Sequence, residues 1–561
     1  MSTARFVTLC GLAGVVIGSV MTHPLVLAPT TTVIDDGTFD AFQFTWNLWW
    51  MRESLFTLHR NPFHTTYLFY PDGVGLLFHT FSSPFGMLSL PLQLVLPGGA
   101  LTANNVLVFL SPALTLIAVG LLARDVTDDA WAGLAGGLAA AVNAVAVWFL
   151  PVIYLHCGYL IAFALWTWGR LHRTTHVRWA IATLTLSWVL VFASAEYGLM
   201  VLALLVLDTL TRAAFAQRLG LPRLWWPGAL GFWAATAVGV VWLGVLAGAD
   251  PAEPPPMHQL LWGSAYILGF FAPPWAMPAP TQFWTILFLG TVPLLLAPYA
   301  VIVDRDRMGY WLLTLVVCLL MACGPYLNLV HPLGLDMDGT PESIEAGGLY
   351  GPYALAYQLV PLLRFFRAPY RWLVPAQIVL GVLVAGGLAG LRTRLPRPRS
   401  RAFVTGVVLA ALPLVGALDA RGLRADIRDA RVPAVYDILR DDPEPAAVLE
   451  LPSGIGPGFS LRSSLYMYYQ THHRKFLLEG TVSRLPAGHQ PVVYRRIDDF
   501  AAMPYVKWVV IHRDLLEHSL PESREQVTGI EGLLAEHGEQ VAASDQIEVY
   551  RLRTFRPETV R

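Results

Sequence analysis

The protein has 561 residues, of which 55% are hydrophobic and only 14% are charged. Soluble chains carry roughly a quarter charged residues, so this composition excludes a protein that lies entirely in water. The formal net charge of -1 gives no overall attraction for nucleic acid, and no basic stripe stands out in the sequence. Nucleic acid is therefore excluded as an expected partner.

Apolar runs of helix length follow one another up to about residue 420. A helix needs about 20 apolar residues to cross the hydrocarbon core, because its backbone groups must bond internally. The stretch 178–211 is too long for one span, so we expect a hairpin that turns near Ser194 and Glu196. The sequence thus predicts an α-helical polytopic membrane protein with about eleven transmembrane helices. The predicted spans are residues 5–22, 103–123, 131–150, 155–170, 178–194, 197–211, 224–247, 281–303, 309–328, 372–391 and 402–420.

Arginines in the short connections fall on one side if the helices alternate. Because cytoplasmic loops retain positive charge, that side is predicted to be cytoplasmic, together with the N-terminus. An odd number of spans then places residues 421–561 on the outer side. The arginines are Arg124, Arg170, Arg173, Arg178, Arg212, Arg218, Arg223, Arg305, Arg307, Arg392, Arg394, Arg397, Arg399 and Arg401.

Two domains are expected, a polytopic transmembrane domain over 1–420 and a soluble domain over 421–561. The transmembrane domain carries three large outer loops, 23–102, 248–280 and 329–371. Long loops on one face suggest a site built there.

The polar C-terminal segment has the patterns of strands and one helix. Residues 447–451, 507–512 and 546–552 are predicted strands, and 530–537 is a predicted helix. These elements predict a small extracytoplasmic α/β domain.

An acidic cluster precedes an aromatic-rich run in the first outer loop. Asp35, Asp36 and Asp40 are followed by the sequence Trp46-Asn47-Leu48-Trp49-Trp50. If a helix starts near Gly37, Asp36 and Asp40 share a face at its positive N-terminal end. One interpretation is an N-capping cluster with a belt of interfacial tryptophans. The other is a carboxylate that deprotonates an acceptor hydroxyl or holds a divalent metal.

The stretch from 34 to 75 resembles a known family. The acidic cluster after the first helix, the W-N-L-W-W run, the Asn61-Pro62-Phe63 segment and the Tyr70-Pro71-Asp72-Gly73 turn resemble the glycosyltransferase C superfamily. Its members include bacterial protein mannosyltransferases and aminoarabinose transferases. The resemblance implies a bacterial plasma (inner) membrane protein that transfers a sugar from a polyprenyl-phosphate donor to a glycan, lipid or protein acceptor.

The family places its base or metal ligand in the first outer loop. The resemblance therefore nominates Asp36 first, with Asp35 and Asp40 beside it, and it leaves open a divalent metal such as Mg²⁺ or Mn²⁺. Many members have a second acidic motif after the third helix, but here residues 150–156 contain no carboxylate. Glu196, at the next outer turn, is a candidate substitute, with a solvated turn residue as the alternative.

Basic and imidazole side chains complete the candidate site. Arg364, Arg367 and Arg371 precede a span on the outer side, where positive charge is unexpected. They are candidates to bind the donor phosphate, with anchoring to anionic membrane lipids as the alternative. Secondary candidates in the first loop are His59, His64 and His79.

Two other functions are compatible with this topology. A lipid or sugar transporter or flippase would need charges in mid-membrane and preferably a pseudo-repeat, neither of which is evident in the sequence. A non-catalytic scaffold for envelope assembly would explain the missing second acidic motif. A membrane glycosyltransferase of inverting type is the leading hypothesis.

Overall fold

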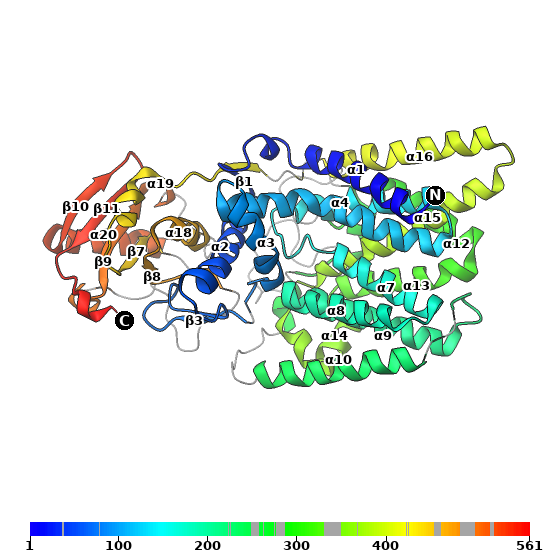
Figure 1. Cartoon of the computed structure of the whole chain (residues 1–561), viewed down its shortest axis with the longest axis horizontal. Coiled ribbons are helices and arrows are strands. Elements are labelled where there is room, and N and C mark those ends of the chain that lie inside the picture. The colour runs from blue at the N-terminus through cyan, green and yellow to red at the C-terminus, as the bar shows by residue number, and fades with distance from the viewer. Residues whose placement is uncertain are drawn as a thin grey trace. The chain divides into compact units, whose positions relative to one another are not determined.

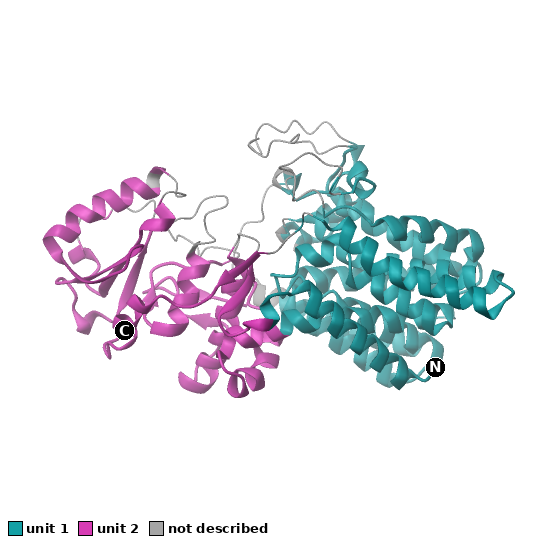
Figure 2. Cartoon of the chain, turned by 90° about the horizontal axis from the view of Figure 1, so that it is seen from above, with its two compact units in different colours: residues 1–26, 107–425 teal, residues 27–106, 426–561 magenta. Residues whose placement is uncertain are grey.

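The structure is a computed structural model that divides into two compact units. Unit 1 contains residues 1–26 and 107–425, and unit 2 contains 27–106 and 426–561 (Figure 2). Most of the first predicted outer loop therefore packs with the C-terminal residues, an association that the sequence analysis did not anticipate. The described residues are 1–35, 39–77, 79–222, 224, 226–247, 257–261, 263–273, 275, 286–329, 349–366, 368–421, 423, 426–453, 462–482, 497, 500–516 and 521–560.

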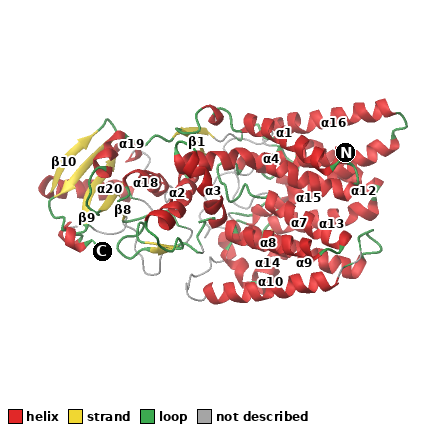
Figure 3. Ribbon diagram, in the orientation of Figure 1, coloured by secondary structure: helices red, strands yellow, loops and turns green. Residues whose placement is uncertain are grey.

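Unit 1 is built almost entirely of helices (Figures 1 and 3). Two short strands, β4 (Tyr326–Leu327) and β5 (Leu349–Tyr350), pair antiparallel. The helices are α1 (Thr3–Met21), α4 (Gly99–Thr127, which starts in unit 2), α5 (Ala130–Ala141), α6 (Ala144–Trp148), α7 (Tyr159–Thr174), α8 (Val177–Ala193), α9 (Ala195–Phe215), α10 (Trp226–Ala247), η3 (Met257–Leu261), η4 (Ile267–Phe270), α12 (Thr291–Val303), α13 (Arg305–Ala322), α14 (Pro352–Leu359), η7 (Pro361–Phe365), η8 (Pro369–Trp372), α15 (Leu373–Arg394) and α16 (Pro398–Asp419).

Within the described residues, six helices are long and apolar enough to cross a membrane. The expectation of a mostly helical chain with apolar helices of membrane-spanning length is therefore confirmed, whereas the number of about eleven spans stays a prediction. Shorter apolar helices, Ala130–Ala141, Val177–Ala193 and Thr291–Val303, overlap other predicted spans. The six are Thr3–Met21, Gly99–Thr127, Ala195–Phe215, Trp226–Leu243, Pro369–Arg394 and Pro398–Asp419.

Helix α15 lies in the interior of unit 1, and glycines allow its closest approach to α5. A Cβ atom at Gly136 of α5 would lie 2.5 Å from the carbonyl oxygen of Gly381 on α15. A Cβ atom at Gly381 would lie 2.6 Å from the oxygen of Gly136. Small residues let two helix backbones meet in this way, as in membrane helix pairs generally.

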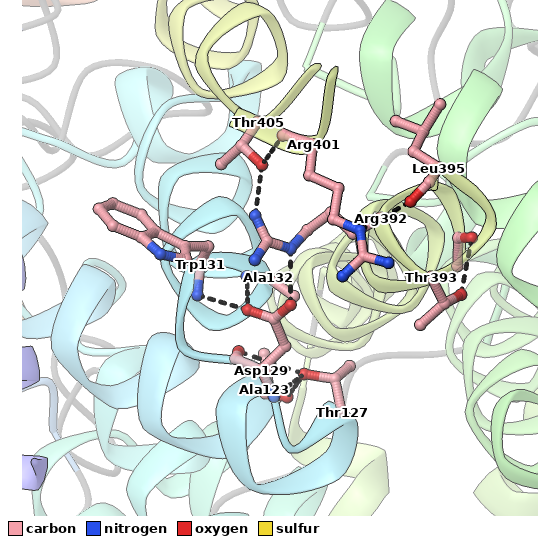
Figure 4. A network of polar contacts seen from close by, with 11 residues as sticks. Ala123, Thr127, Asp129, Trp131, Ala132, Arg392, Thr393, Leu395, Arg401 and Thr405 are labelled. Atoms are coloured by element: carbon pink, nitrogen blue, oxygen red, sulfur yellow. Dashed lines mark hydrogen bonds and ion pairs between the residues drawn. The ribbon is translucent and has the colours of Figure 1, made fainter. Parts of the chain in front are cut away.

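A polar network joins the ends of α5, α15 and α16 (Figure 4). Asp129 accepts hydrogen bonds from the N–H groups of Trp131 and Ala132 at the start of α5. Its other carboxylate oxygen lies 2.7 Å from Nε of Arg392, and Arg392 also donates to Thr405 Oγ1 of α16. One carboxylate thus caps a helix and holds the arginine that links two others.

The sheet of unit 2 has the strand order β10-β11-β9-β7-β8. β7 (Ala447–Leu451) lies parallel to β8 (Phe476–Leu477) and to β9 (Val506–His512). β11 (Ile547–Leu552) pairs antiparallel with β9 and with β10 (Gly538–Ala543). Predicted strands 447–451, 507–512 and 546–552 correspond to β7, β9 and β11. The extracytoplasmic location of this sheet stays a prediction.

Side chains of the sheet alternate between two cores. Leu449 and Val509 pack with Ile530 of α20 (Pro521–His537). Val448 and Val510, on the other face, belong to a core that includes residues of α18 (Arg462–His473) and of α2 (Asp40–Arg52). Successive side chains of a strand point to opposite faces, which is why one strand supplies both cores.

The N-terminal part of unit 2 consists of short elements around α2. β1 (Thr32–Asp35) pairs antiparallel with β6 (Asp426–Asp429), so segments far apart in the sequence share a two-stranded sheet. The remaining elements of unit 2 are η1 (Leu25–Leu27, which starts in unit 1), η2 (Glu53–Thr57), β2 (His64–Thr65), β3 (Val74–Gly75), α3 (Ser83–Val95), η9 (Ala434–Tyr436), α17 (Asp437–Arg440), η11 (Phe500–Ala502), α19 (Arg513–Leu516) and η12 (Pro557–Thr559).

Candidate functional site

Asp35, at the end of β1, has a structural position. Its side chain is fully buried and forms an ion pair of 2.5 Å with Nε of Arg428 on β6. It also accepts a hydrogen bond of 2.9 Å from the N–H of Phe39, which adopts a left-handed conformation with φ 62°. The guanidinium of Arg428 lies over the ring of Phe39, 4.6 Å from its centroid. Asp35 therefore links the end of β1 to β6 and to the residue that precedes α2.

Of the other two carboxylates of the cluster, the structure describes only Asp40. Asp36, the first candidate for catalysis, lies outside the described residues. Asp40 is half-buried in the first turn of α2, where the helix dipole stabilises a negative charge. The N-cap residue of α2 is Phe39, and no side chain of a described residue caps this helix, so the N-capping interpretation is wrong for Asp35 and Asp40. A catalytic role of Asp36 stays a prediction.

The aromatic run on α2 is part of a protein core. Trp46, Trp49 and Trp50 are all buried, and the rings of Trp46 and Trp50 stack with centroids 5.7 Å apart. Trp46 donates a hydrogen bond of 2.7 Å to the side chain of Gln470 on α18. The interpretation of an interfacial tryptophan belt is therefore wrong for these residues, because an aromatic amphipathic run suits a buried helix equally well.

His79, one of the three candidate histidines, contacts α2. Gln43 of α2 donates to Nε2 of His79 over 2.9 Å, and its amide also lies within hydrogen-bonding distance of Thr80 and Thr481. Burial lowers the pKa of His79 to about 3, so its ring is neutral and accepts a hydrogen bond from the Gln43 amide. His59 and His64 are exposed.

In unit 1 the structure joins two predicted site residues that lie 175 positions apart. Glu196 begins α9, immediately after the turn at Ser194, and Arg371 lies in η8 just before α15. Nη1 of Arg371 is 2.6 Å from Oε2 of Glu196, and both side chains are largely buried, with 20% and 11% exposed. Glu196 is therefore a buried partner of an arginine and not a solvated turn residue.

This ion pair lies against the segment that follows α6. The guanidinium of Arg371 lies over the ring of Tyr154, 5.8 Å from its centroid. Tyr197, next to Glu196, donates a hydrogen bond of 2.8 Å to the carbonyl oxygen of Leu155. Three segments of unit 1 thus meet at one charged pair.

The space beside Glu196 measures only about 10 Å³. Its walls are mainly apolar side chains, including Leu199, Met200, Leu363 and Trp372. A space of this size holds at most a single water molecule, so these side chains are closely packed.

Among the described residues, the candidate phosphate-binding arginines Arg364 and Arg371 have different partners. Arg364 donates to the carbonyl oxygens of Tyr357 and Gln358, at the end of α14, over 3.1 and 3.0 Å. Arginine side chains often satisfy carbonyl groups at a helix C-terminus in this way. Arg367 lies outside the described residues. Phosphate binding by Arg364, Arg367 and Arg371 stays a prediction.

The described residues contain no group of three His, Cys, Asp or Glu side chains arranged to hold a metal ion. The carboxylate of Asp35 is already paired with Arg428, so it is a poor metal ligand. Since Asp36 lies outside the described residues, a divalent metal stays a prediction.

Two residues of the site were not identified from the sequence. Arg428 lies 393 positions after Asp35, and only the pairing of β1 with β6 makes them neighbours. Gln43 lies in the aromatic run, and its position four residues before Asn47, on the same helix face, was a weak signal of a polar stripe. Asn47 donates a hydrogen bond of 2.8 Å to the carbonyl oxygen of Thr80.

The fold is similar to that of an arabinofuranosyltransferase. Over 98% of this chain the structure matches the arabinofuranosyltransferase AftD from mycobacteria, with a TM-score of 0.56 and 14% identity. The chain spans only 40% of the length of AftD. At this identity the likeness shows the fold alone.

Two further solved structures are more distant. The oligosaccharyltransferase AglB from Archaeoglobus fulgidus matches with a TM-score of 0.45 and 13% identity, over 96% of this chain and 74% of that chain. ArnT from Cupriavidus metallidurans matches with a TM-score of 0.49 and 10% identity, over 98% of both chains. No protein-family model and no curated protein matches the sequence. The chain thus shares its fold with AftD, as the resemblance of residues 34–75 to glycosyltransferases led us to expect.

Proposed function

We propose that the protein is a membrane glycosyltransferase that moves a sugar from a polyprenyl-phosphate donor to an acceptor on the outer face of a bacterial inner membrane. The observation that carries this proposal is the fold shared with a membrane arabinofuranosyltransferase over 98% of the chain. Six helices that are long and apolar enough to cross a membrane, found among the described residues, support it. A donor with an isoprenoid tail must remain in the bilayer while its head group reacts, and a membrane-spanning enzyme meets that need.

The proposed chemistry is an inverting transfer with Asp36 as general base. The carboxylate of Asp36 takes the proton of an acceptor hydroxyl while the hydroxyl oxygen forms a bond to the anomeric carbon. The bond between that carbon and the phosphate oxygen breaks, and the polyprenyl phosphate leaves with the electron pair. The ion pair of Asp35 with Arg428 supports this role indirectly, because it fixes the backbone immediately before Asp36.

The proposed sites for the donor phosphate are the arginines of unit 1. Arg371 contacts Glu196 through Nη1, and among the described residues its Nε has no hydrogen-bond partner. Charge-assisted hydrogen bonds from such groups stabilise a departing phosphate. A glycan, a lipid and a protein are the acceptor classes, and the sheet of unit 2 is the proposed place for acceptor contacts.

The test of this proposal uses the full-length protein in lipid vesicles with radiolabelled pentose and hexose donors on polyprenyl phosphate. Formation of a labelled acceptor or of labelled free sugar, absent with heat-inactivated protein, is the expected result. Uptake of label without cleavage of the sugar–phosphate bond would identify a flippase instead. Absence of both transfer and uptake with every donor would favour a non-catalytic scaffold for envelope assembly.

A further inference from the structure

A second cavity of unit 1 contains polar groups that the proposed reaction does not yet use. Its volume of about 40 Å³ leaves room for one or two groups the size of a hydroxyl or a water molecule. Its walls come from α5, α6, the segment after α6 and the start of α15. Val145, Phe149, Leu155, Val374 and Ile378 make much of this lining apolar.

Two buried side chains in this lining each have a nitrogen atom without a hydrogen-bond partner among the described residues. Nδ1 of His156 and Nε2 of Gln377 have no hydrogen-bond partner in the part of the chain that the structure describes. His156 is 7% exposed and Gln377 is 4% exposed. The other polar side chains of the cavity are satisfied, since Asn143 bonds Ala139, Ala140 and Ala146, and Thr115 bonds Ser111. An orphaned polar group in an apolar interior is costly, so a ligand that bonds both would be favoured.

The tautomer of His156 follows from its one hydrogen bond. Its Nε2 lies 3.1 Å from the carbonyl oxygen of Ala146, and a carbonyl only accepts, so Nε2 carries the hydrogen. In the neutral ring Nδ1 is then an acceptor. The amide of Gln377 offers a donor and an acceptor in either orientation.

This pair of groups matches a hydroxyl. A hydroxyl donates its proton to one nitrogen and accepts a hydrogen bond from an amide N–H, which neither a phosphate nor an ammonium does. The described residues that line the cavity include no Asp, Glu, Lys or Arg, so the cavity suits an uncharged group.

The cavity shares a backbone segment with the ion pair described above. Tyr154 contacts Arg371, Leu155 accepts from Tyr197, and His156 follows directly and enters the cavity lining. A ligand held by Arg371 through its phosphate would thus have its uncharged part near the same segment.

We propose that His156 and Gln377 bind one hydroxyl of the sugar carried by the lipid-linked donor, an inference that rests on the proposed transfer reaction. The hydrogen bonds would position the sugar, with no proton transferred in the reaction. The segment 150–156, which lacks the second acidic motif, would then contribute through His156 to donor recognition.

The experiment compares two donors with the full-length protein in detergent. One is the polyprenyl-phosphate sugar that the wild type transfers, and the other is the same polyprenyl phosphate without sugar. Binding is measured by the shift of the melting temperature with ligand concentration. Gln377→Leu and His156→Phe should each raise the Kd of the sugar-linked donor by roughly tenfold and leave that of the sugar-free lipid unchanged.

Matched controls are Gln358→Leu and His176→Phe, two exposed positions of unit 1. Unchanged binding of the sugar-free lipid shows that a variant is folded, and Gln377→Met replaces Gln377→Leu if the latter does not fold. A donor that lacks the relevant hydroxyl should bind wild type and Gln377→Leu equally.

The possible failures are distinguishable. If the wild type transfers sugar but the variants bind both lipids normally, with an equal or higher melting temperature, the cavity holds only water and this inference is wrong. If the wild type neither binds nor transfers any sugar-linked donor, the proposed function fails, and this inference fails with it.

Discussion

Arg371 and Glu196 form a largely buried ion pair of 2.6 Å that joins the start of α15 to the start of α9. Taking either partner away leaves the other charge without its partner in a poorly hydrated place, which typically costs about 3 kcal/mol or more. We therefore expect Arg371→Met and Glu196→Gln each to lower the melting temperature clearly.

The double variant tests whether the two residues act as a pair. Arg371→Met combined with Glu196→Gln should destabilise by less than the sum of the single effects, because no unpaired charge remains. Melting temperatures of the four proteins in one detergent provide the measurement. Strictly additive effects would contradict the pairing.

Asp35 and Asp36 are adjacent, but we expect opposite consequences of their replacement. Asp35→Asn removes the ion pair with Arg428 and should cost about 2 kcal/mol of unfolding free energy. Asp36→Asn should leave the melting temperature near that of wild type and abolish transfer. Thermal melting and sugar transfer, measured on both variants, check this. Equal losses of stability in the two variants would contradict the distinction between a structural Asp35 and a catalytic Asp36.

His79 makes stability depend on pH through its buried ring. Its pKa is about 3 in the folded protein, whereas the unfolded chain takes up a proton near 6.5. The unfolded state therefore binds more protons between these values, so stability falls as the pH drops from 6.5 towards 3 and is unaffected by this group above 6.5. From pH 6.5 to pH 5 the loss due to His79 should be about 2 kcal/mol.

The measurement is the melting temperature at pH 7 and pH 5 for wild type and His79→Gln. The glutamine retains an acceptor for Gln43 but does not titrate, so it should lose less stability on acidification. His64→Gln, at an exposed position, is the control and should behave as wild type. An identical pH dependence of all three proteins would show that His79 is not buried and neutral.

Arg392 holds three helices through Asp129 and Thr405, so Arg392→Met should destabilise unit 1 by about 1–2 kcal/mol. The exposed Arg399 lies seven residues later, and Arg399→Met should change stability by less than about 0.5 kcal/mol. The measurement is the melting temperature of Arg392→Met and of Arg399→Met, each compared with wild type. Equal effects would mean that the network in Figure 4 contributes nothing beyond surface charge.

The sequence predicts local elements of this fold well. Apolar runs located most helices of unit 1, and the turn expected near Ser194 separates α8 from α9. Helix formation in an apolar run depends on neighbouring residues and on backbone bonding within the segment, so it is visible locally.

Long-range contacts were not predictable. Glu196 and Arg371 were each selected as candidates, but no local pattern indicated that they pair. The same holds for Asp35 with Arg428, and for the packing of 27–106 with 426–561. The tryptophans of α2 were misread as interfacial because a single aromatic stripe fits burial against protein and against lipid. The unpaired atoms of His156 and Gln377 also become visible only when their surroundings are known.

The most direct test of the central claim is single-turnover transfer from a radiolabelled polyprenyl-phosphate sugar by wild type, Asp36→Asn and Asp72→Asn. Asp72 is an exposed carboxylate of the same predicted loop and serves as the control. The account predicts transfer by wild type and Asp72→Asn, and a rate lower by roughly a hundredfold or more for Asp36→Asn with its donor binding intact. A wild-type rate in Asp36→Asn, or no transfer by wild type from any donor, would contradict it.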